Sequence, residues 1–186
     1  MNRRDAIEQI SLLFGGTVVG STFFLNGCKS NPAKEGAFST DDVAYLDEIA
    51  DTILPPTKTP GAKAAQTGMF MTVMVNDCYD ENEQKIFHDG MQKLNDLSKK
   101  TYDKSFVKIT PQQKHDLLVQ LDKEQKDYMK NKKEKYPVHY FRMMKELTLL
   151  GYFTSEIGCT QARRYIQTPG RFEGCVPYKK GDKAWA

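Results

Sequence analysis

The sequence predicts a mainly α-helical protein, with a single compact helical domain that ends in an irregular C-terminal tail. Apolar residues recur at helical spacing over several stretches, which is typical of helices with a buried face. Three of these stretches begin with helix-capping residues, and no stretch shows the sustained alternation that marks β-strands. A chain of 186 residues supports one substantial core. We therefore assign residues 38–186 to one helical domain.

The N-terminus has the composition of a lipoprotein export signal. An uncharged apolar run over residues 10–25 is shorter than the roughly 20 residues of a membrane-spanning helix, which favours a cleaved signal over residues 1–27. The sequence Leu25-Asn26-Gly27-Cys28 resembles a lipobox, so Cys28 would be lipidated and residues 28–37 would form a tether. The alternative is an uncleaved membrane helix followed by an ordinary cysteine.

Arg3 and Arg4 form a pair ahead of the apolar run. Twin arginines at this place direct bacterial proteins to a pathway that exports folded cargo. Any basic start can contain two arginines, but the neighbouring Asn2 and Ala6-Ile7 fit the wider pattern. We expect export to the bacterial cell envelope, with the mature chain periplasmic and lipid-anchored to a membrane.

The first two helices of the domain are predicted from a cap and from apolar spacing. Ser39 or Thr40 can cap a helix that Pro55-Pro56 stops. After a turn region, residues 69–78 form an apolar stretch with three methionines, Met69, Met71 and Met74. Without nearby histidines or a cysteine motif, packing explains the methionines better than metal binding.

The remaining helices follow in order. Asp80-Glu-Asn-Glu83 is a capping box for a helix to about Lys100, and Thr110-Pro-Gln-Gln113 begins another that ends before Pro137. Residues 138–153 are apolar around most of a helical circumference and must be covered on more than one side. One side can be covered by the chain's own core and the other by a partner. Residues 167–186 form the irregular tail.

No motif predicts a catalytic, cofactor or metal site. A Cys-x-x-Cys-His haem motif and a Gly-rich dinucleotide turn are both missing from the sequence. The three histidines, His88, His115 and His139, are scattered on predicted helices, where surface or helix-end roles fit them best. A net charge of +3 is too small to indicate nucleic-acid binding. We expect a non-catalytic chain without a bound cofactor or metal.

Three cysteines remain besides Cys28. We expect a disulfide between Cys78 and Cys175, because both lie in polar or loop settings and the compartment permits disulfides. Cys159 follows an apolar, helix-like stretch and would be a buried free thiol. The alternative is three free thiols, since sequence does not show proximity.

The C-terminal part of the chain contains three distinctive stretches: residues 145–156 (Lys-Glu-Leu-Thr-Leu-Leu-Gly-Tyr-Phe-Thr-Ser-Glu), Arg164-Tyr165 and residues 169–177 (Pro-Gly-Arg-Phe-Glu-Gly-Cys-Val-Pro). Together they resemble the C-terminal signature of the gluconate 2-dehydrogenase subunit 3 family. Residues 50–62 and Asp77-Cys-Tyr79 resemble its earlier signatures. The resemblance implies a small non-catalytic subunit of a flavin-dependent dehydrogenase for a sugar, polyol or aldonate. FAD would then be bound by the large subunit.

The expected role is therefore to bind, escort and membrane-tether a flavoprotein large subunit, with a cytochrome c subunit as a further candidate partner. A chain this small cannot easily cover all its aromatic residues, so we expect partner contacts from Tyr152, Phe153, Phe172, Val176 and Trp185. For Tyr152 and Phe153, burial in the core is the alternative. The alternative function is a stand-alone envelope lipoprotein with a scaffold role.

Overall fold

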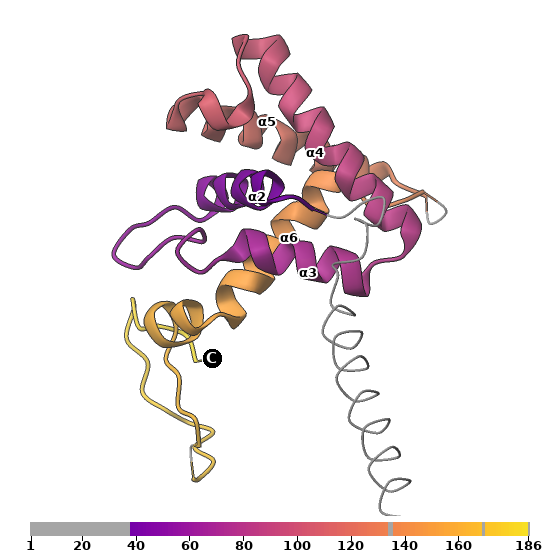
Figure 1. The fold of residues 1–186 in the computed structure, drawn as a ribbon. Coiled ribbons are helices and arrows are strands. Elements are labelled where there is room, and N and C mark those ends of the chain that lie inside the picture. Colours follow the sequence, from indigo (N-terminus) through magenta and orange to yellow (C-terminus); the bar gives the residue numbers. More distant parts are fainter. Residues whose placement is uncertain (1–37, 134–135, 169, 186) are drawn as a thin grey trace, which may run out of the picture. The chain divides into compact units, whose positions relative to one another are not determined.

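A computed structural model describes residues 38–133, 136–168 and 170–185, and in these ranges the protein is mainly helical and has no β-strand (Figure 1). Its α-helices are α2 (Thr40–Ile53), α3 (Thr67–Cys78), α4 (Glu81–Tyr102), α5 (Pro111–Asn131) and α6 (Tyr140–Thr154). Two short helical turns, η1 (Phe106–Lys108) and η2 (Gly158–Ala162), follow α4 and α6. The predicted helical fold with an irregular tail is confirmed.

The predicted signal and tether lie outside the described residues, as do Arg3, Arg4 and Cys28. Among the helices that the structure describes, none is both long enough and apolar enough to cross a membrane.

Three helices begin at predicted cap residues, and each start is a capping box. The Ser39 hydroxyl accepts a hydrogen bond from the Asp42 N–H, and the Asp42 carboxylate accepts one from the Ser39 N–H, at 3.2 and 2.8 Å. Asp80 begins α4 and Thr110 begins α5 with the same reciprocal arrangement. Each box satisfies N–H groups that have no partner within the helix.

α6 is the helix around which the others pack. It contacts α2, α3, α4, α5 and η2. Its buried residues occupy several sides of the helix: Phe141, Met143, Met144, Leu147, Thr148, Gly151 and Tyr152. The predicted coverage on more than one side is confirmed, and the chain's own helices supply most of it.

Helices α2 and α3 approach closely at Gly68. A Cβ atom added there would lie 2.6 Å from the main-chain oxygen of Val43 and 2.7 Å from Asp47 Oδ1. The Gly68 N–H donates to the same Asp47 oxygen at 2.7 Å. Burial raises the pKa of Asp47, although this hydrogen bond opposes the shift. Glycine therefore allows the first turn of α3 to lie against α2.

Two carboxylates link the helices through paired lysines. Glu48 of α2 binds Lys63 and, at 2.6 Å, the nearly buried Lys114 of α5; these hydrogen bonds lower the pKa of Glu48. Asp122 of α5 binds Lys126 at 2.6 Å and Lys145 of α6 at 2.5 Å. Burial alone would raise the pKa of Asp122, but the two lysines lower it to about 2. Both carboxylates hold elements together as ionised groups.

Candidate subunit interface

Apolar side chains are exposed on two adjacent helices. Met69 and Val73 of α3 are about half exposed. Leu149 and Leu150 of α6 are slightly less exposed. The helices lie side by side, since Gly151 of α6 meets the Phe70 ring and Thr67 of α3. We refer to Met69, Val73, Leu149 and Leu150 as the helical face. Exposed apolar side chains on adjacent helices are candidates for contact with a partner.

The second exposed apolar set lies in residues 163–185, which we refer to as the tail. Its exposed apolar and aromatic side chains are Tyr165, Ile166, Phe172, Val176, Tyr178 and Trp185. Phe172 is 95% exposed. Burying a solvent-exposed phenylalanine ring is favourable, and a partner that covers the ring gains this free energy. Phe172 is therefore a candidate anchor for a partner.

The predicted contact residues divide into two groups. Phe172, Val176 and Trp185 lie on the surface, where a partner can reach them. Tyr152 is only 4% exposed and its hydroxyl donates to the Pro60 carbonyl at 2.8 Å, so it belongs to the core and is not an exposed anchor. Phe153 is half-buried, with the Arg163 guanidinium 4.7 Å from its ring centre.

The expected disulfide between Cys78 and Cys175 is not present in the structure, where Cys78, Cys159 and Cys175 are all free. Cys78 is the last residue of α3, whose 12 residues make a helix about 18 Å long. The first turn of α3 lies beside the end of α6, from which η2 and the tail extend (Figure 1). Cys78 therefore lies at the end of α3 that is farther from this contact, whereas Cys175 lies in the tail that follows η2. Cys159 is half-buried, with its thiol 3.3 Å from the Phe153 carbonyl oxygen.

His139 and His115 have the helix-end and surface roles that were predicted, whereas His88 is half-buried within α4. His139 caps α6, because its Nδ1 accepts a hydrogen bond from the Phe141 N–H at 3.2 Å, and burial lowers its pKa. His115 is exposed on α5. His88 stacks on the Phe38 ring at 4.3 Å. Within the described ranges, no group of three or more histidine, cysteine or carboxylate residues is arranged to hold a metal ion.

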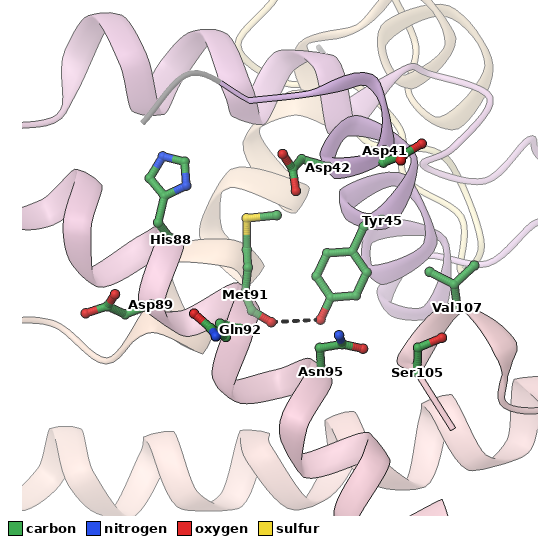
Figure 2. A pocket seen from close by; sticks show the side chains of 10 residues that line it. All are labelled: Asp41, Asp42, Tyr45, His88, Asp89, Met91, Gln92, Asn95, Ser105 and Val107. Atoms are coloured by element: carbon green, nitrogen blue, oxygen red, sulfur yellow. Dashed lines mark hydrogen bonds between the residues drawn. The ribbon is translucent and has the colours of Figure 1, made fainter. Parts of the chain in front are cut away.

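A polar pocket of about 470 Å³ lies among α2, α4 and the η1 segment, as Figure 2 shows. The Tyr45 hydroxyl donates to the Met91 carbonyl at 3.1 Å, and burial raises the pKa of Tyr45, which keeps it a neutral donor. Asn95 accepts a hydrogen bond from the Phe106 N–H at 3.1 Å. Asp42 is already used by the α2 cap. These three polar groups serve the fold, and we assign the pocket no catalytic role.

Comparison with known proteins decides the family. The model of the family described as gluconate 2-dehydrogenase subunit 3 matches residues 40–170. The chain belongs to this family. The predicted resemblance is confirmed, and the family's name describes a subunit of gluconate 2-dehydrogenase. Neither the curated proteins nor the solved structures gave a match.

The range matched by the gluconate 2-dehydrogenase subunit 3 family includes all five described α-helices, η2 and the first part of the tail. Phe172, Val176, Tyr178 and Trp185 follow the matched range. Sequence reasoning missed the helical face and Tyr178. The spacing of Met69 and Val73, four residues apart on a helix, places them on one side and could have indicated it.

Proposed function

We propose that this chain is a non-catalytic small subunit that binds a flavin-dependent dehydrogenase, escorts it during export and tethers it to the membrane. Membership of a dehydrogenase-subunit family supports a partner, and the exposed anchors of the tail and the helical face supply a surface for it. The observation that carries the proposal is Phe172, whose ring is almost fully exposed although the chain is otherwise able to bury large rings.

In this proposal the chemistry belongs to the large subunit. Its FAD would oxidise a sugar, polyol or aldonate, and the electrons would pass to a separate acceptor such as a cytochrome c subunit. The small subunit would cover part of the flavoprotein. The helical face and the tail, which project from neighbouring parts of the fold, are the surfaces assigned to this contact.

Export explains why such a subunit would carry the signal. A flavoprotein binds its cofactor as it folds in the cytoplasm, and the twin-arginine route accepts folded cargo. Arg3 and Arg4 would then export both subunits as one complex, and the lipid on Cys28 would hold the complex on the periplasmic side of the bacterial envelope.

The variant Arg3→Lys/Arg4→Lys tests the escort role. We expect the dehydrogenase to stay in the cytoplasm and dye-linked activity in the envelope to fall at least about tenfold, because the paired arginines are the export address. Detergent extraction, pull-down and flavin fluorescence identify the partner in parallel. The control is Arg142→Lys, which makes the same kind of change at an exposed position of α6, outside the signal. Full export of the flavoprotein by the double variant, or pull-down without any flavoprotein, would leave the stand-alone scaffold lipoprotein as the function.

Lipidation is tested separately by labelling with a fatty acid. We expect Cys28→Ala to lose the label and to release the complex from membranes, because no thiol remains at the lipobox. Cys78→Ala, which removes an exposed thiol elsewhere, is expected to keep both properties. Equal labelling of the two variants would show that Cys28 is not the lipidated residue.

A further inference from the structure

The tail is closed into a loop at its two ends. The Arg164 N–H donates to the Ala184 carbonyl at 2.8 Å, and the Arg164 guanidinium lies 4.4 Å from the ring centre of Trp185. Nearby, the Lys183 ammonium donates to the Gln161 carbonyl. Figure 1 shows the tail leaving η2, extending away and doubling back toward it. The segment between Arg164 and Trp185 is therefore held at its base.

Between these ends the loop has few contacts with the helices. Phe172 is 95% exposed and Tyr178 is 73% exposed. The contacts found there are local, such as the Arg171–Glu173 ion pair at 2.5 Å and the Lys179 N–H that donates to Asp182 at 3.0 Å. The rings of Phe172 and Tyr178 are therefore presented to solvent.

The charge of the loop is strongly one-sided. Residues 163–186 contain six basic and two acidic side chains, an excess of four, whereas the whole chain has a net charge of only +3. Among the described ion pairs, Arg171 is the one tail cation that meets a carboxylate. Arg163 and Arg164 lie against aromatic rings, and Arg164 Nε is buried without an acceptor. Lys179 and Lys180 are exposed, so their charges can meet an external anion.

We propose that this closed basic loop docks on an acidic surface of the dehydrogenase subunit, with Phe172 and Tyr178 as anchors and the lysines as its charged rim. The inference rests on the proposed function and adds the surface and its chemistry. Aromatic and arginine side chains dominate protein interfaces, and complementary charge guides association.

A protein surface fits the loop better than a lipid surface does. Segments that lie on membranes place apolar residues on one face of a helix and basic residues on the other. This tail is irregular, and its aromatic residues alternate with charges and with an internal ion pair. Closure at Arg164 and Trp185 also reduces the conformational entropy that binding would cost, which favours a shaped protein site.

The loop is tested with the full chain and the flavoprotein subunit with which it co-purifies. We expect Lys179→Glu/Lys180→Glu to raise the Kd about tenfold or more at low salt, with a smaller effect at high salt. Phe172→Ala should raise the Kd about tenfold at both salt concentrations. The matched control, Lys123→Glu/Lys130→Glu, reverses two exposed charges on α5 and should bind like the wild type. All variants should keep the wild-type melting temperature.

The outcomes separate this inference from the proposed function. Wild-type chain that binds the flavoprotein, together with tail variants that bind equally well, overturns the loop assignment and leaves the proposed function intact. Wild-type chain that retains no flavoprotein overturns both. Binding to vesicles of anionic phospholipid is measured in parallel. Loss of vesicle binding by the tail variants, with unchanged binding to the flavoprotein, would show that the loop meets lipid and would overturn the protein site.

Discussion

Replacing Phe87 with alanine is expected to lower the free energy of unfolding by about 3–5 kcal/mol. Phe87 of α4 has no exposed surface and packs edge-on against Phe38, with ring centres 6.1 Å apart. Removing the ring loses its burial and leaves a cavity that the surrounding helices cannot fill completely. Urea unfolding of the purified chain, followed by circular dichroism, gives the change directly.

Phe172→Ala is the matched control, because it removes the same atoms from a ring that is 95% exposed. We expect it to change the free energy of unfolding by no more than about 0.5 kcal/mol. If both variants lost a similar free energy of unfolding, Phe87 would not be a buried core residue and Phe172 an exposed tail residue.

Gly68→Ala is expected to destabilise the domain by about 2 kcal/mol. The added Cβ would lie 2.6 Å from a main-chain oxygen, that of Val43, which cannot rotate away as a side chain can. Helices α2 and α3 would have to separate, and the hydrogen bond from the Gly68 N–H to Asp47 would lengthen. The intrinsic helix preference of alanine, worth about 1 kcal/mol over glycine, offsets part of this cost.

Gly174→Ala is the control for the added methyl group. Its Cβ would meet only the Phe172 ring, at 3.1 Å, and that ring is free to turn because it is exposed. The melting temperature should stay within about 2 °C of wild type. If Gly174→Ala lowered the melting temperature more than Gly68→Ala does, the α2–α3 contact at Gly68 would not be close.

Helix boundaries could be predicted wherever a local hydrogen bond sets them. Ser39, Asp80 and Thr110 each bond to a residue three positions ahead, so the sequence contains the complete signal. The start of α3 was placed at Met69 instead of Thr67. Its N-cap, Gln66, has a φ of 52° and makes no side-chain cap hydrogen bond, so no residue pattern marks this start.

The burial of Tyr152 and the closure of the tail depend on long-range contacts, which could not be predicted from the sequence. Tyr152 is buried because the Pro60 carbonyl, far away in the sequence, accepts its hydroxyl hydrogen. The aromatic character of Tyr152 suits a core or an interface equally, and only this contact distinguishes them. The same holds for Arg164 and Trp185, whose pairing closes the tail although neither residue belongs to a turn motif.

The place of α6 in the chain affects how the domain forms during synthesis. α6 contacts all the other α-helices that the structure describes, yet it leaves the ribosome after them. Until it appears, α2 to α5 have no partner for the apolar surfaces that it covers, and Phe141, Met144 and Leu147 are not yet present to join them. Domains generally fold as units, and exposed apolar surface makes unfinished chains prone to aggregation. Nascent chains that end before α6 should therefore depend on chaperones, and a ribosome that pauses within residues 140–154 would prolong that dependence.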